Sequence, residues 1–172
     1  MKTLYLLRHA EADRQDQAVS DYDRPLATFG IEAARQVGRT MYARGWLPQA
    51  VLCSAARRAV ETWEMVAPEI TVAAKPQSQR ELYLAPPARL ITALRGQSKS
   101  IASILLIGHN PGIGGLARAL AGPGSAAPAK SRLRRGYPTA TLGVVSLAID
   151  EWAAIRPEDG RLLHLLYPSD PD

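Results

Sequence analysis

Short runs of apolar residues alternate along this chain with longer segments in which apolar residues recur at helical spacing. The runs at 4–7, 50–53, 70–73 and 103–108 are almost entirely apolar, which predicts strands buried on both faces. Helical spacing between Gly, Pro or Ser residues predicts helices over 31–43, 55–65, 87–94 and 113–120. The tail predicts two further strands, 141–149 and 161–167, joined by a turn at 157–160.

Strands that alternate with helices at this spacing predict an α/β fold of three αβα layers. Its mostly parallel central sheet would carry helices on both faces, and the two C-terminal strands could add an antiparallel edge. We expect one domain over 1–172. The polar segment 11–23 predicts a loop, and 121–138, where Gly, Pro and Ala precede four basic residues, predicts a mobile basic loop.

The composition is that of an ordinary globular domain. The chain has 172 residues, of which 47% are hydrophobic and 22% charged. A single cysteine, Cys53, excludes intramolecular disulfides and cysteine zinc clusters. Charges over 8–16 interrupt the apolar N-terminus, and no run is long enough to span a membrane, so we expect no signal peptide, no membrane contact and a cytoplasmic protein. We further expect a monomer or a weak dimer.

The net charge of +5 is unevenly distributed. Residues 1–81 hold 11 basic and 10 acidic side chains, 82–149 hold 8 basic and no acidic ones, and 150–172 hold 2 basic and 6 acidic ones. A region that carries only positive charges favours anionic partners. The alternative explanation is a general preference for arginine in this protein, because arginine supplies 17 of the 21 basic residues. Nucleic acid is not expected, because the few aromatic residues do not interleave with the basic run.

Two predicted strands are each followed closely by a histidine. Arg8 and His9 follow the first strand, and His109 and Asn110 follow the run at 103–108. Carboxyl ends of parallel strands meet at the edge of the sheet where ligands bind. Arginines also occur in the 54–58 segment, and guanidinium groups hold phosphoryl oxygens by bidentate hydrogen bonds. A metal site is not expected, because the three histidines stand apart and His164 is predicted to be structural.

Five motifs follow one another along nearly the whole chain. They are Leu-Arg-His-Ala-Glu at 7–11, Pro25-Leu26 with Gly30, Ser54 with Arg58-Ala59 and Thr62, Gly-His-Asn-Pro-Gly at 108–112, and Tyr-Pro-Thr-Ala at 137–140 with Trp152. In these residues the chain resembles the histidine phosphatase superfamily, and within it the small SixA-like phosphohistidine phosphatases. The resemblance implies a fold like that of phosphoglycerate mutase.

The resemblance also implies a role for each matched residue. His9 would be the nucleophile that becomes transiently phosphorylated, and Arg8, Arg58 and His109 would hold the phosphoryl oxygens, with Asn110 beside them in the substrate site. No metal or other cofactor is implied. A nucleophilic imidazole must be neutral, and neighbouring arginines lower its pKa.

Glu81 is the expected general acid, and later the base that activates water. It follows the third predicted strand, and the alternative is that it is a solvated charge or a partner of Arg80. The sequence departs from the family pattern at Ala10, which replaces a glycine and fits if its φ is negative, and at Ala27, which replaces a threonine. Glu11 is expected to orient its loop or to pair with an arginine.

Two other enzyme classes can be tested on the residues alone. A cysteine phosphatase needs arginine six positions after its cysteine, but that position after Cys53 is Ala59. Residues 112–117 fit a loose dinucleotide-binding pattern. That pattern requires an acidic residue about 20 positions later, and no Asp or Glu occurs between 82 and 149.

We therefore expect a metal-independent phosphatase that works through phosphorylated His9. Its expected substrate is phosphohistidine on a protein, because no long insertion remains to cover the site. A phosphatase for a small phosphate ester, such as a sugar phosphate or a nucleotide, is the alternative, whereas a mutase would need capping segments. From a different class, a non-catalytic phosphate-binding module remains open.

Overall fold

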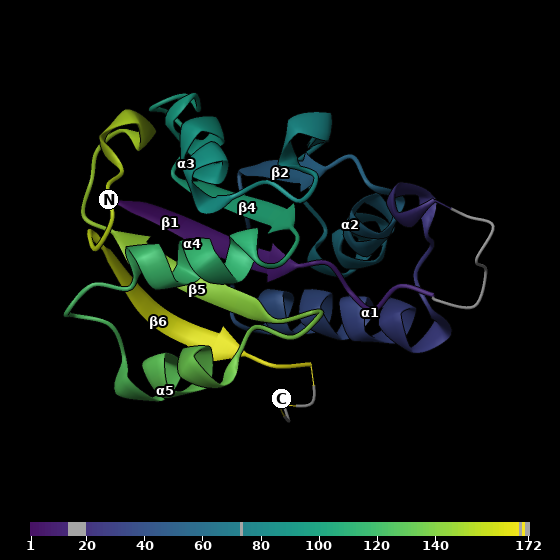
Figure 1. The fold of residues 1–172 in the computed structure, drawn as a ribbon. Helices are drawn as coiled ribbons and strands as arrows, with labels where there is room; N and C mark the ends of the chain where they lie inside the picture. Colours follow the sequence, from purple (N-terminus) through teal and green to yellow (C-terminus); the bar gives the residue numbers. More distant parts are fainter. Residues whose placement is uncertain (14–19, 73, 169, 171–172) are drawn as a thin grey trace.

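The computed structural model describes residues 1–13, 20–72, 74–168 and 170, and a six-stranded sheet forms its centre (Figure 1). The strand order is β3-β2-β4-β1-β5-β6. The strands are β1 Lys2–Arg8, β2 Ala50–Ser54, β3 Pro76–Gln79, β4 Ser103–Gly108, β5 Leu142–Leu147 and β6 Gly160–Leu166.

The four N-terminal strands run parallel and the two C-terminal strands antiparallel to their neighbours. β1 lies between β4, its parallel partner, and β5, its antiparallel partner, and β6 pairs antiparallel with β5. The prediction of a mostly parallel sheet with an antiparallel C-terminal edge is confirmed. Register places Arg8 opposite Gly108, so β1 and β4 end side by side.

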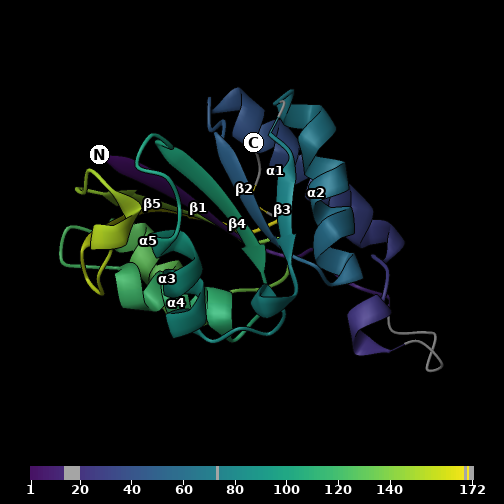
Figure 2. The same ribbon diagram turned by 90° about the horizontal axis from the view of Figure 1, so that it is seen from above.

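Helices cover both faces of the sheet (Figure 2). On one face lie α1 Thr28–Ala43 and α2 Arg57–Ile70, and on the other α3 Pro87–Arg95, α4 Gly112–Leu120 and α5 Ala127–Arg135. Successive side chains of a strand point to opposite faces. Accordingly, Leu4 and Leu6 pack in the core under α3, α4 and α5, whereas Tyr5 and Leu7 pack in the core under α1 and α2.

The predicted third strand at 70–73 is wrong. Ile70 instead ends α2, where it is fully buried four positions after buried Val66, so it continues the apolar stripe of that helix. The helix predicted to end at residue 65 therefore runs through Pro68, and Thr71 ends it with a left-handed φ of 50°. Residue 73 lies outside the described residues.

The true third strand, β3, is polar and mostly exposed. It lies at the edge of the sheet and pairs only with β2, so its side chains need not be apolar. Hydrophobic patterning could not identify such a strand, because its stability comes from the backbone hydrogen bonds to β2.

The predicted mobile loop at 121–138 is wrong in its central part, which forms α5. Pro128 lies in the first turn, where a missing N–H costs nothing. Ala129 and Leu133, four positions apart, are both buried in the core under this helix. Burial of one leucine side chain stabilises a fold by about 2 kcal/mol, so these two apolar residues dock an otherwise charged helix.

Three short 3-10 helices complete the described structure: η1 Asp21–Asp23, η2 Arg80–Leu82 and η3 Trp152–Ala154. η1 lies in the predicted loop 11–23, of which residues 14–19 are outside the described part. Trp152 is fully buried, and its indole Nε1 donates to the Ile101 carbonyl at 2.9 Å. Within the described ranges, no helix combines the length and apolar character needed to cross a membrane.

Candidate active site

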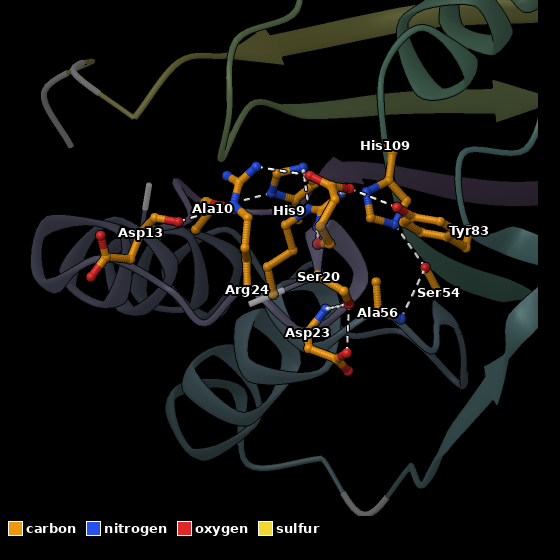
Figure 3. A network of polar contacts seen from close by, with 12 residues as sticks. His9, Ala10, Asp13, Ser20, Asp23, Arg24, Ser54, Ala56, Tyr83 and His109 are labelled. Carbon is orange, nitrogen blue, oxygen red and sulfur yellow. Dashed lines mark hydrogen bonds and ion pairs between the residues drawn. The ribbon is translucent and has the colours of Figure 1, made fainter. Parts of the chain in front are cut away.

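The two histidine motifs meet where β1 and β4 end. The backbone N–H of His9 donates to the Gly108 carbonyl at 3.0 Å, and the ring centroids of His9 and His109 are 4.9 Å apart. The predicted convergence of the two histidines at the carboxyl edge is therefore present in the structure. Figure 3 shows both rings in one network of polar contacts.

His9 is 7% exposed and its two ring nitrogens have different partners. Nδ1 lies 2.7 Å from the Ala10 carbonyl oxygen, so it carries the proton and donates. Nε2 is then the nitrogen with a lone pair, and it accepts from Nε of Arg58 at 3.2 Å. Ala10, at the signature glycine position, has a negative φ, which is the condition for alanine to fit there.

His109 is buried beside the Ser54 hydroxyl. Its Nε2 lies 2.7 Å from Ser54 Oγ, and this oxygen also accepts the backbone N–H of Ala56 at 3.3 Å (Figure 3). Among the described residues, Nδ1 of His109 has no hydrogen-bond partner although it is buried. With Ser54 donating to Nε2, that Nδ1 carries a proton that a ligand oxygen could accept.

Arg58 lies in the first turn of α2 and is 4% exposed. Its Nη2 forms an ion pair with Oδ2 of Asp21 at 3.0 Å, and its Nη1 donates to the Asp21 carbonyl. The Tyr83 hydroxyl also donates to Asp21 Oδ2, at 2.6 Å. This hydrogen bond, together with the Arg58 guanidinium, lowers the pKa of Asp21 despite partial burial.

The spacing of the α2 motif has a geometric cause. Ser54 contacts His109, Arg58 contacts His9, and the Thr62 hydroxyl accepts the Ala10 backbone N–H at 3.0 Å. Residues four apart lie on the same face of a helix, so Arg58 and Thr62 both face the loop after β1. Arg57, the neighbour, is exposed and pairs instead with Glu61 at 2.6 Å.

Arg8 and Asn110 share one carbonyl. Nη1 of Arg8 and Nδ2 of Asn110 both donate to the Tyr137 carbonyl, at 3.0 and 2.8 Å. The Tyr137 hydroxyl in turn donates to the Leu6 carbonyl at 2.7 Å, so the segment after α5 is fastened to β1. The 137–140 motif thus positions two residues that line the site.

A cavity of about 400 Å³ lies over these groups. Five predicted site residues line it: Arg8, His9, Arg58, His109 and Asn110. The sequence predictions missed the other lining residues, which are Ala12, Asp21, Arg24, Leu84 and Thr139, and gave Glu11, which also lines it, only a supporting role. A signal for both Asp21 and Arg24 exists in the sequence, since Arg24 directly precedes the Pro25-Leu26 motif and Asp21 lies four positions before it.

The acidic residues are placed differently from expectation. Glu81 is exposed in η2 and is not among the residues that line the cavity. Glu11 does line it, and its Oε2 accepts from the Thr139 hydroxyl at 2.9 Å. In the described part of the chain, no group of three or more His, Cys, Asp and Glu side chains is placed to hold a metal ion.

Gly30 explains how α1 approaches this loop. A Cβ atom on Gly30 would lie 2.2 Å from the Glu11 carbonyl oxygen, which itself accepts the Ala27 backbone N–H at 2.9 Å. Only glycine permits so close an approach of the first turn of α1 to the backbone beside His9. Ala27 is the N-cap residue of α1 and, lacking a hydroxyl, makes no side-chain cap.

Both histidines are held neutral. Burial lowers the pKa of His9 to about 4, the charges of Arg58 and Arg8 act in the same direction, and the hydrogen bond to Ala10 opposes them. Burial, followed by the charges of His9 and Arg58, lowers the pKa of His109 to about 3. A neutral imidazole whose Nε2 carries no proton can act as a nucleophile.

These pKa values predict an acid-sensitive fold. Below pH 6.5 the unfolded chain binds protons that the two folded imidazoles do not, so the free energy of unfolding should fall by ~1.4 kcal/mol per pH unit for each histidine until its folded pKa is reached, about 4 for His9 and about 3 for His109. Urea unfolding at pH 7 and pH 5 measures this. Ring NMR signals of His9 and His109 should not shift between pH 8 and pH 5. A titration of either near pH 6.5 would contradict the assignment.

Comparisons with known proteins find similar sequences. The family model of the histidine phosphatase superfamily (branch 1) matches residues 4–82. An uncharacterised protein of Mycobacterium tuberculosis is 32% identical over 163 residues, which cover 94% of this chain and 99% of that protein.

Two solved structures resemble the whole chain. A proposed phosphohistidine phosphatase SixA from Nakamurella multipartitia is 27% identical with a TM-score of 0.82, covering 98% of this chain and 97% of that one. Another from Agrobacterium tumefaciens is 25% identical with a TM-score of 0.82, covering 97% and 98%. With its paired histidines, its arginines and these relatives, the chain belongs to the histidine phosphatase superfamily, in the SixA-like group.

Proposed function

We propose that this protein is a phosphatase that acts through a phosphorylated His9 and removes phosphoryl groups from phosphohistidine on proteins. One observation carries the proposal: Nδ1 of buried His9 donates to the Ala10 carbonyl, which leaves Nε2 unprotonated beside Arg58, and His9 lines a cavity together with arginines and a second histidine. A binding module has no need for a neutral, oriented nucleophile.

In the first step, Nε2 of His9 attacks phosphorus and forms an N–P bond while the bond to the leaving group breaks on the opposite side. Arg8, Arg58 and Nδ1–H of His109 donate to the three equatorial oxygens, where negative charge accumulates. For phosphohistidine, the electron pair of the broken P–N bond returns to an imidazole. This leaving group needs less proton donation than the alkoxide of an ester.

In the second step, water attacks phosphorus, releases inorganic phosphate and returns His9 to its neutral form. We propose that the Asp21 carboxylate takes the proton from this water. It lines the cavity and its lowered pKa keeps it ionised at neutral pH, which suits a base better than an acid. The exposed position of Glu81 outside the lining does not support the role expected for it from the sequence.

The positive charge for the transition state comes from the arginines themselves. The guanidinium groups of Arg8, Arg24 and Arg58 line the cavity and remain protonated at any physiological pH. They can therefore neutralise a doubly charged phosphoryl group, so we propose that the reaction does not depend on a metal ion.

Turnover of three substrates tests the proposal. We expect kcat/KM for a phosphohistidine peptide to exceed that for a matched phosphoserine peptide or a sugar phosphate by at least ~100-fold, since an imidazole leaving group needs less proton donation than an alkoxide. EDTA should leave turnover unchanged. Faster hydrolysis of the sugar phosphate would favour the small-ester alternative, and phosphate binding without any turnover would favour a binding module.

A further inference from the structure

The helix α5 carries an unbalanced positive charge. It contains Lys130, Arg132, Arg134 and Arg135, and no acidic residue occurs anywhere between 82 and 149. Ala129 and Leu133 face the core, so the basic side chains occupy the remaining, outward sides of the helix. Like charges three or four positions apart on a helix repel one another and destabilise it. The four cations of α5 therefore do not serve the stability of the helix alone.

The four cations of α5 are not equivalent. Arg132 forms an ion pair with Asp170, and its guanidinium lies 5.3 Å from the centroid of the Tyr167 ring. The charge of Arg135 helps to lower the pKa of Asp170. In contrast, the side chains of Lys130 and Arg134 make no hydrogen bond or ion pair with any residue that the structure describes.

Lys130 and Arg134 face a groove between α5 and α4. The groove has a volume of about 250 Å³ and a floor made by Ala121 and Leu133. Arg118 of α4 forms its third basic wall, held in place where its Nη2 donates to the Leu133 carbonyl at 3.3 Å. Three cations around a short apolar floor suit a segment that carries carboxylates next to small apolar residues.

The two helices that form the groove also lead to the active site. α4 begins two residues after Asn110, and α5 ends just before Tyr137, whose carbonyl binds both Arg8 and Asn110. The two helices lie beside each other on the same face of the sheet (Figure 1). With 1.5 Å of rise per residue, Arg118 lies about 9 Å along α4 from its first residue. An extended peptide spans that distance with three or more residues.

We infer that the groove lined by Arg118, Lys130 and Arg134 docks an acidic segment of the phosphorylated protein, three to six residues from its phosphohistidine. The inference rests on the proposed function and names the substrate's chemistry. Charge complementarity of this kind raises the association rate and selects partners more than it changes the chemical step. The groove should therefore affect KM for acidic substrates and leave kcat unchanged.

Two phosphohistidine peptides test the inference, one with four glutamates three to six residues from the phosphohistidine and one with glutamines there. We expect the double variant Lys130→Glu/Arg134→Glu to raise KM for the acidic peptide about 10-fold at low salt, and less at 0.3 M salt. Its kcat, and its turnover of the glutamine peptide and of phosphoramidate, should equal those of the wild type.

A matched control reverses two exposed cations elsewhere. Lys99 and Arg156 lie before β4 and after η3, outside the groove and the cavity, so Lys99→Glu/Arg156→Glu makes the same charge change without touching either. This control should retain the wild-type preference for the acidic peptide. Equal losses in both double variants, or a wild type that does not prefer the acidic peptide, would overturn the inference.

Direct binding separates this inference from the proposed function. The anisotropy of a fluorescein-labelled, unphosphorylated acidic peptide should rise with wild-type protein, and Lys130→Glu/Arg134→Glu should abolish the rise. If no phosphohistidine peptide were hydrolysed, the proposed function would fail. The anisotropy measurement would still show whether the groove binds an acidic segment. Equally strong binding of polyphosphate would identify a general anion site and overturn the docking of an acidic segment.

Discussion

Replacement of His9 by alanine is expected to abolish the phosphoenzyme and to lower kcat/KM by at least ~10⁴-fold. The proposed reaction passes through an N–P bond at Nε2, and no other neutral imidazole can replace it, because Nε2 of His109 is engaged with Ser54. Losses of a covalent nucleophile are of this size in other enzymes.

The measurement is a brief incubation with a labelled phosphoramidate, an alkaline quench and peptide mapping of the label. Wild-type protein should carry an acid-labile, alkali-stable phosphoryl group on His9, and His9→Ala should carry none. His164→Ala is the control, because His164 lies exposed in β6 with its ring beside Trp46, outside the cavity. Label on His109 in the wild type, or undiminished turnover in His9→Ala, would refute the mechanism.

Two adjacent arginines provide the second large contrast. Arg58→Ala is expected to lower kcat by about 10² to 10³, because it removes the group that contacts Nε2 of His9 and would bind the transferred phosphoryl oxygens. Arg57→Ala removes the same functional group one position away, where it is exposed and, among the described residues, is bound only to Glu61. We expect its kcat to stay within about twofold of the wild type, since exposed ion pairs contribute little.

Steady-state kinetics on a phosphohistidine peptide, with circular dichroism to verify folding, measure this contrast. Arg58→Lys should remain impaired by at least ~10-fold, since a single ammonium group cannot contact His9 and grip a phosphoryl group as a planar guanidinium does. Full activity in Arg58→Lys would show that only charge matters at this position. Equal losses in Arg57→Ala and Arg58→Ala would contradict the geometry of the site.

The asymmetry between these neighbours shows how much of the site follows from the motif spacing on which the family resemblance rests. Arg58 is four positions from Ser54 and four from Thr62, and these intervals place both Arg58 and Thr62 toward the loop after β1. The two histidines follow largely buried strands that pair parallel, so their convergence could be predicted from the apolar runs before them. In each case local periodicity contains the required geometric information.

The sequence could not predict which carboxylate reaches the cavity. Asp21 lies in a polar segment without periodicity, and its contacts with Arg58 and Tyr83 span 37 and 62 positions. Glu81 has the expected place after a strand, but its side chain is exposed. The direction of one side chain in an irregular segment depends on distant partners, which no local pattern encodes.

By itself, the sequence determined the buried strands β1, β2 and β4 and most of the helices, because runs of apolar residues and helical spacing reflect local backbone geometry, and the family resemblance in its motifs pointed to Arg8, His9, Arg58 and His109. Only the tertiary structure decided that polar β3 forms the sheet edge, that α5 is a docked helix and that Asp21 occupies the fork of Arg58. These features depend on backbone pairing and on contacts between segments that are distant in the sequence. Such contacts produce no periodic pattern of apolar residues from which they could be predicted.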